Sequence, residues 1–160
     1  MGPFNKGRSS MHTDNDRAIK TLNDLIETTL DSVNGYRHAA DGVSNPELKT
    51  LFTERAGKRE ELSRRLQAEV RTFGGEPEDD QSLLGRIHNK FAEIRGELMG
   101  RDDSGVIDEV ERGEDVIKAR FEDATKDADL PDTLRQRVAE EYVSIKADHD
   151  TISGLKHRLN

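Results

Sequence analysis

Hydrophobic residues recur three and four positions apart along most of the chain, the spacing that places side chains on one face of an α-helix. The first such stripe spans residues 19–40 and follows a capping motif that begins at Thr13. The second spans residues 48–73, with Asn45 as the expected N-cap and Pro46 at the first helical position. Because few residues separate them, the two helices are expected to form an antiparallel hairpin.

An acidic linker at residues 76–80 separates the first hairpin from the second half of the chain. A shorter stripe at 84–98 predicts a helix long enough to carry the chain along the bundle, and stripes at 107–124 and 134–155 predict another hairpin. We therefore expect an all-α, ferritin-like four-helix bundle of two antiparallel helix hairpins, with an additional short helix in the crossover connection.

Composition and length favour one domain. The 160 residues are 36% charged and 32% hydrophobic, which fits narrow helical stripes with large solvated faces. Residues 13–160 are expected to form the single domain, and residues 1–12 to be a disordered leader or an expression remnant. The absence of cysteine excludes disulfides, thiolate metal sites and thiol catalysis.

Charge and hydropathy narrow the classes of partner. A net charge of −8 and a 4% aromatic content argue against nucleic acid, which needs concentrated Lys and Arg or stacking rings. No apolar run reaches the roughly 20 residues of a membrane span, and no secretory signal is recognisable, so we expect a cytoplasmic protein without membrane contact.

Four polar residues fall on or beside the stripes of the expected core. His149 lies in line with the stripe of the last helix. It is expected to be either a structural histidine held by hydrogen bonds or a residue that binds a metal or transfers a proton. Glu111 and Glu114 flank the stripe of the preceding helix, and buried carboxylates need a partner. A divalent metal ion, His149, or an internal salt bridge to Arg59 on the stripe of the second helix would each supply one.

The first helix offers further candidates. Glu27 and Asp31 lie on one shoulder of its stripe, where such pairs usually face water, and Tyr36 lies within the stripe, where its hydroxyl needs a buried partner. Gly35 and Gly113 are helix-interior glycines, each costing up to about 1 kcal/mol relative to alanine. They indicate close helix approach or room for another group.

The motifs of known catalytic sites are missing from the chain. A complete di-iron site in a bundle uses Glu-x-x-His on two helices, and no such motif occurs. His-Glu-x-x-His, a phosphate loop and a nucleophile elbow are also missing. We therefore name no catalytic residue and favour a non-enzymatic role over an enzymatic one.

Several short segments together resemble a mostly proteobacterial, uncharacterised family of four-helix-bundle proteins in the ferritin-like superfamily, which carries a domain-of-unknown-function label. They are Leu22-Asn23-Asp24-Leu25-Ile26-Glu27, Asp31, Gly35-Tyr36, Phe73-Gly74-Gly75-Glu76-Pro77, Gly85-Arg86-Ile87-His88, Glu111-Arg112-Gly113-Glu114-Asp115 and His149-Asp150. The resemblance implies a ferritin-like, stress-related bacterial bundle that holds at most one divalent metal ion, Fe, Mn or Zn. The positions nearest to a metal site are Glu27, Glu111, Glu114 and His149, and the further buried polar candidates are Asp31, Tyr36, Arg59, Asp115 and Asp150.

Two functional hypotheses follow. In the first, the protein is non-enzymatic and associates with itself or with a helical partner, through shoulder residues such as Leu25, Leu30, Leu51 and Val143. In the second, it is a metal-binding protein with a degenerate carboxylate and histidine site and a redox or storage role. Convergence of the four metal candidates would favour the second hypothesis, whereas Arg59 at their centre would favour the first.

Overall fold

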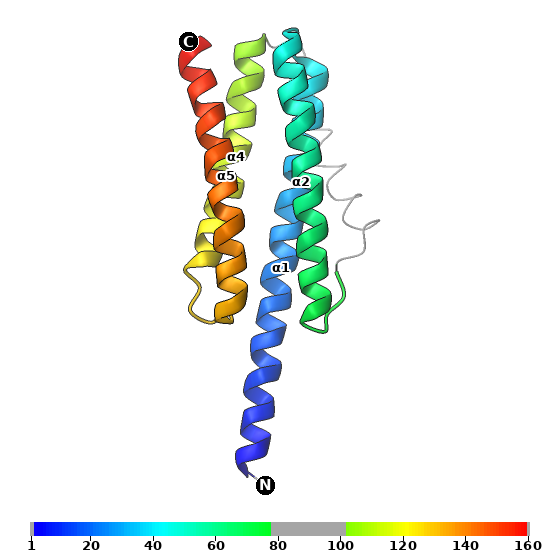
Figure 1. The fold of residues 1–160 in the computed structure, drawn as a ribbon, viewed down its shortest axis with the longest axis vertical. Coiled ribbons are helices and arrows are strands. Elements are labelled where there is room, and N and C mark those ends of the chain that lie inside the picture. Colours follow the sequence, from blue (N-terminus) through cyan, green and yellow to red (C-terminus); the bar gives the residue numbers. More distant parts are fainter. Residues whose placement is uncertain (1, 78–101, 160) are drawn as a thin grey trace.

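The computed structural model describes residues 2–77 and 102–159, which form helices α1 (Gly2–Gly42), α2 (Pro46–Thr72), α4 (Asp103–Thr125) and α5 (Asp132–Leu159), with no strand in these ranges. The predicted all-α bundle of two antiparallel hairpins, α1 with α2 and α4 with α5, is confirmed (Figure 1). Helices α2 and α4 run in the same direction, so the end of α2 and the start of α4 lie at opposite ends of the bundle (Figure 1). The helix predicted at 84–98 lies outside the described residues.

Local capping chemistry sets the ends of α2 where the sequence predicted them. The Asn45 side chain accepts hydrogen bonds from the backbone N–H groups of Glu47, at 2.8 Å, and Leu48, at 3.3 Å. At the other end Gly74 takes a φ of 82°, and Gly75 N–H donates to the carbonyl of Val70 at 3.0 Å. This left-handed C-terminal cap satisfies carbonyls that the last turn would otherwise leave unpaired.

Helix α1 begins at Gly2, well before the predicted start at Thr13, and its first turns extend beyond the ends of the other helices (Figure 1). Pro3 is the only proline before Pro46, and a proline is tolerated in the first turn of a helix. Nothing in the intervening sequence therefore forces the helix to stop. The assignment of residues 1–12 to a leader stays a prediction.

The core consists of two apolar clusters stacked along the bundle axis. The first cluster includes Leu22, Leu66, Phe121 and Ile145, and the second includes Val33, Phe52, Ile107 and Ile152. Fully burying one such side chain stabilises the fold by about 1.5–3 kcal/mol. Buried polar side chains, named below, lie between the two clusters.

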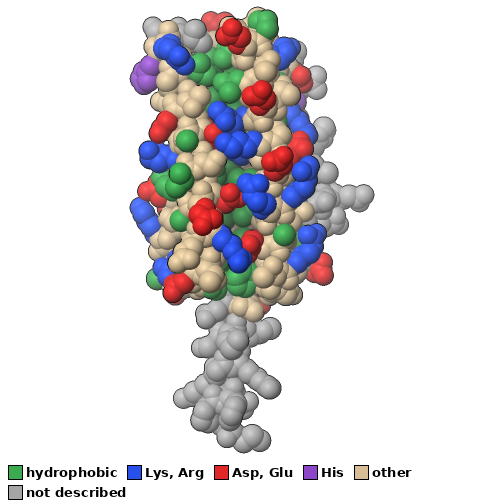
Figure 2. Space-filling model, in the orientation of Figure 1, with side chains coloured by type: hydrophobic (Ala, Val, Ile, Leu, Met, Phe, Trp, Pro, Cys, Tyr) green, Lys and Arg blue, Asp and Glu red, His purple; other side chains and the backbone are tan. Residues whose placement is uncertain are grey.

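Polar contacts join the two hairpins. The Asp103 carboxylate accepts hydrogen bonds from the backbone N–H groups of Ser44, at 2.7 Å, and Asn45, at 3.0 Å. Along the contact of α2 with α5, charged side chains alternate on the surface (Figure 2), including an ion pair of 2.9 Å between Arg65 and Glu141. Exposed pairs of this kind contribute about 0–1 kcal/mol each.

The shoulder residues proposed for a second interface are mostly used inside the fold. Leu25 is 3% exposed and belongs to the first cluster, so its assignment to the surface was wrong. Leu30 and Leu51 pack against the core at its edge. Val143 and Val116 are the large exposed hydrophobic side chains of the described ranges. Among the helices described, none is long and apolar enough to cross a membrane.

Candidate functional site

Arg59 lies at the centre of the bundle and is 1% exposed. Its guanidinium Nη1 donates to Ser32 Oγ at 2.8 Å, and Nη2 donates to Glu114 Oε2 at 2.9 Å and to Asp148 Oδ2 at 3.3 Å. These partners come from α1, α4 and α5, so one side chain of α2 joins all four helices. Burial alone would lower the pKa of Arg59, but the charge and hydrogen bond of Glu114, together with the charges of Tyr36 and Asp148, outweigh burial and raise that pKa.

Glu114 is shared between Arg59 and a buried tyrosine. The Tyr36 hydroxyl donates to Glu114 Oε1 at 2.5 Å, and the Arg59 guanidinium carbon lies 5.6 Å from the centre of the Tyr36 ring. Burial, together with the negative charge of Glu114, raises the pKa of Tyr36 well above its ordinary value. The phenol therefore stays neutral and acts as a hydrogen-bond donor.

Asp148 is the second buried carboxylate of this layer, at 4% exposure. Besides Arg59 it accepts from Lys58 Nζ at 3.0 Å and pairs with Arg55 Nη1 at 2.7 Å. The sequence analysis missed Asp148, although it lies three residues after Ile145 and four before Ile152, both buried. That spacing was the signal that could have found it.

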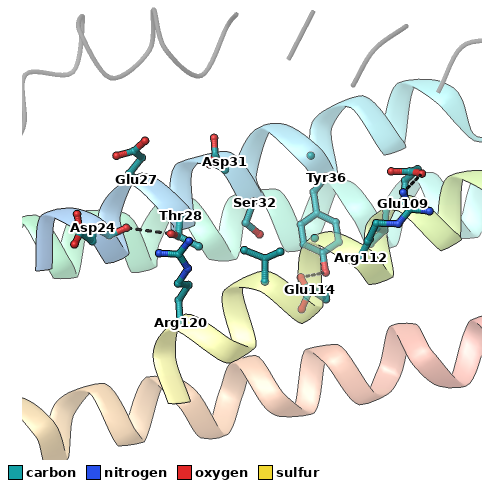
Figure 3. A pocket seen from close by; sticks show the side chains of 14 residues that line it. Asp24, Glu27, Thr28, Asp31, Ser32, Tyr36, Glu109, Arg112, Glu114 and Arg120 are labelled. Carbon is teal, nitrogen blue, oxygen red and sulfur yellow. Dashed lines mark hydrogen bonds and ion pairs between the residues drawn. The ribbon is translucent and has the colours of Figure 1, made fainter. Parts of the chain in front are cut away.

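Beside this layer, a cavity of about 480 Å³ opens between α1 and α4. The glycines Gly35 of α1 and Gly113 of α4 line it, and a Cβ built on either would meet no described atom within 4 Å. Tyr36 reaches from α1 toward Glu114 of α4 in the wall of this cavity (Figure 3). The sequence left close helix approach and room for another group as alternatives for these glycines, and among the described residues the structure shows room.

Charged side chains surround the cavity. Glu27 and Asp31 project from α1 at its rim, while Arg120 reaches across from α4 toward α1 (Figure 3). Arg112 is paired with Glu109 at 3.2 Å. In total the lining holds five carboxylates, Asp24, Glu27, Asp31, Glu109 and Glu114, against two arginines, Arg112 and Arg120, a net charge of −3.

The four residues predicted to lie nearest to a metal site do not converge. Glu114 lies in the central layer and Glu27 at the rim of the cavity. Glu111 accepts a hydrogen bond from Lys156 at 2.8 Å, and His149 Nε2 lies 2.6 Å from Asp115 Oδ1, both at the contact of α4 with α5. Across the described ranges, no group of three or more His, Asp or Glu side chains is arranged to hold a metal ion.

The donor chemistry of the centre also does not fit a metal ion. Each oxygen of Glu114 already accepts a hydrogen bond, one from Tyr36 and one from Arg59. The fixed positive charge of the guanidinium lies where a bound cation would sit between the helices, and it would repel such a cation. The salt bridge from Arg59 to Glu114, one of the two alternatives drawn from the sequence, is the one observed.

The other buried polar candidates divide into two groups. Arg59 and Tyr36 are buried as predicted, and Asp31 is half-buried. Asp115 and Asp150 are not buried, since their side chains are 62% and 59% exposed, and they flank the partly buried ring of His149. Asp115 follows the buried Glu114 by one position, and Asp150 follows the buried Asp148 by two. Because an α-helix turns by about 100° per residue, both aspartates point to the surface.

Comparison with known proteins gives one family. The sequence profile of the family described as "Domain of unknown function (DUF2383)" matches residues 17–127, more than half of the chain. The matched span contains most of α1 and all of α2 and α4. It therefore includes both walls of the cavity and the residues Tyr36, Arg59 and Glu114, which contact one another. No curated protein matches the chain.

Proposed function

Since the chain belongs to the family described as a domain of unknown function (DUF2383), we propose a function from its site: the protein is a non-enzymatic binding protein. It associates with itself or with a helical partner through the face formed by α1 and α4. The order of hairpin, long connection and hairpin supports a ferritin-like bundle. A stress-related role in the bacterial cytoplasm, which the resemblance implies, belongs to the same proposal.

One observation carries this proposal, the cavity of about 480 Å³ between α1 and α4. Ligand-binding cavities usually measure about 300–1,000 Å³. Two helix-interior glycines, Gly35 and Gly113, line this cavity. No described atom lies within 4 Å of a Cβ built on either, so close packing does not explain why these positions are glycine. Each glycine costs up to about 1 kcal/mol relative to alanine. No packing contact within the described fold offsets this loss of stability. A group bound in the cavity would explain why the glycines are there.

The central polar layer supports binding in preference to catalysis. Glu114 is 1% exposed and both of its oxygens accept hydrogen bonds, so it has no free position as a general base. The raised pKa of Tyr36 keeps its phenol protonated. Arg59 holds both groups in place. The layer thus builds one wall of the cavity and offers no reactive group.

The proposal is tested by placing a photo-reactive amino acid at position 116 or at position 143. Both are exposed valines, at 51% and 68%, but only Val116 lines the cavity. We expect a defined cross-linked product at 116, either a second copy or one other protein, and none at 143. Sedimentation velocity with Val116→Lys and the matched control Val143→Lys then measures self-association. Equal cross-linking at both sites, or none at 116, contradicts the proposed binding face.

A further inference from the structure

The α4 wall of the cavity carries a second stripe of side chains, beside the stripe that faces the core. Four residues that line the cavity follow one another at spacings of four, three and four: Glu109, Gly113, Val116 and Arg120. This spacing places them on one face of the helix, and it is the spacing of the contact seam between two packed helices. Val116 is 51% exposed, so the contact of α4 with α1 does not use up this face.

The order of residues along this stripe is complementary to its own reverse. The acidic Glu109 and the basic Arg120 lie toward opposite ends of the α4 wall (Figure 3), and Gly113 and Val116 lie between them. If the stripe is laid antiparallel against a second copy of itself, Arg120 of each copy faces Glu109 of the other. In the same alignment Val116 of each copy faces Gly113 of the other. Both pairings are centred between positions 114 and 115, so one two-fold axis generates them together.

Gly113 supplies the space that this alignment needs. A Cβ built on it meets no described atom within 4 Å, so the position is open to a side chain from outside. Val116 of a second copy would lie there against the helix backbone, which the missing side chain leaves accessible. The valine would lose its contact with water, and this loss favours association.

Ion pairs within the chain decide which charged groups remain for a partner. Most carboxylates of the lining are already compensated, as Glu114 is by Arg59, so the net charge of the lining selects no partner. Arg120 is exposed and has no ion pair among the described residues. Glu109 pairs with Arg112 at 3.2 Å, but a carboxylate has about four lone-pair positions and can accept from a second guanidinium.

We infer that the face formed by α1 and α4 binds a second copy of this chain, in a symmetric dimer whose two α4 helices lie antiparallel in contact. The inference rests on the proposed function, because it selects self-association from the two kinds of partner proposed there. Arg120 of each copy pairs with Glu109 of the other at the two ends of a contact about 16 Å long. Val116 of each copy fills the open position at Gly113 of the other.

Charge reversal tests this alignment, with sedimentation velocity of the full chain as the measurement. Arg120→Glu places like charges opposite each other at both ends of the contact, and so does Glu109→Arg. We expect each single variant to dimerise at least about tenfold more weakly than the wild type. The variant that carries both changes restores opposite charges and should dimerise like the wild type. Glu140→Arg makes the same change of charge at an exposed position of α5 outside the cavity, and it should stay dimeric.

Mixing the two single variants gives a second readout. A mixed pair has opposite charges at both ends of the contact, so an equimolar mixture of Arg120→Glu with Glu109→Arg should form heterodimers. Gly113→Leu leaves every charge in place but fills the space for the valine, and it should also weaken the dimer at least about tenfold. Circular dichroism of each variant checks that its helical fold is retained.

Three results would overturn the inference. They are a wild type that stays monomeric up to roughly 0.1 mM, single variants that dimerise like the wild type, and single variants whose dimer is recovered neither by the double variant nor by the mixture. If cross-linking at Val116 to another protein persists in these cases, the proposed binding face stands and only the symmetric dimer fails.

Discussion

Replacing Arg59 by methionine tests how the central layer is held together. Methionine keeps much of the aliphatic volume but removes hydrogen bonds to Ser32, Glu114 and Asp148. Removing one partner of a buried ion pair typically costs about 3–5 kcal/mol, because the other charge stays buried without compensation. For a chain of this size we expect the melting temperature to fall by roughly 6–20 °C, at about 2–4 °C per kcal/mol.

The contacts predict which carboxylate is responsible for that cost. Without Arg59, the one hydrogen-bond donor that Glu114 keeps among the described residues is the Tyr36 hydroxyl, whereas Asp148 keeps Arg55 at 2.7 Å and Lys58 at 3.0 Å. Neutralising Glu114 in the Arg59→Met background should therefore recover much of the lost stability. Neutralising Asp148 should recover little.

Urea unfolding of the single and double variants measures these couplings. We expect a coupling energy of about 2–3 kcal/mol between Arg59→Met and Glu114→Gln, and under about 1 kcal/mol between Arg59→Met and Asp148→Asn. The reasoning is refuted if Arg59→Met costs less than about 1 kcal/mol, or if the two couplings are equal.

Three further outcomes are expected. Gly113→Ala should raise the free energy of unfolding, measured in urea, by up to about 1 kcal/mol, because the new Cβ meets no described atom within 4 Å. Gly75→Ala should lower this free energy, because the new Cβ would lie 2.7 Å from the Cδ1 carbon of Ile19. Because folding raises the pKa of Tyr36, the neutral phenol contributes stability that is fully present below pH 10.0, the ordinary pKa of tyrosine, and is lost as the pH rises above that value. In Tyr36→Phe the free energy of unfolding should therefore fall less steeply with rising pH. The hydrogen bond from His149, followed by that from Lys146, lowers the pKa of Asp150, so NMR titration of His149→Ala should show that pKa rising toward 3.8. Elemental analysis of the wild type and the same variant, titrated with Fe(II), Mn(II) and Zn(II), tests the metal hypothesis, and stoichiometric metal lost in His149→Ala would support it.

The helices and their pairing were predictable because they depend on local patterns. Asparagine before proline fixed the start of α2, and the glycine pair fixed its end. Arg59 and Tyr36 were recognised as inward-facing because each continues an apolar stripe at helical spacing. Both predictions depend only on the direction in which a side chain points from its own helix, and the spacing along the sequence gives that direction.

The composition of the central layer was harder to predict because it depends on how four helices face one another. Asp148 is buried while its neighbour His149 lies at the edge, a difference of one position on the stripe of α5. Glu111 and Glu114 both flank the stripe of α4, but only Glu114 meets Arg59. The cavity depends on the distance between α1 and α4 at the two glycines, which no pattern within one helix determines.

The polar layer between the two apolar clusters has a consequence for the axial register of the helices. Aliphatic side chains pack against one another in many alternative alignments, so a bundle held by them alone could slide by a turn at little cost. A slip of α2 by one turn, about 5.4 Å, would carry the Arg59 guanidinium away from Glu114 and into aliphatic surroundings. The misaligned bundle would bury an unpaired charge, so this single arginine selects one alignment of the four helices.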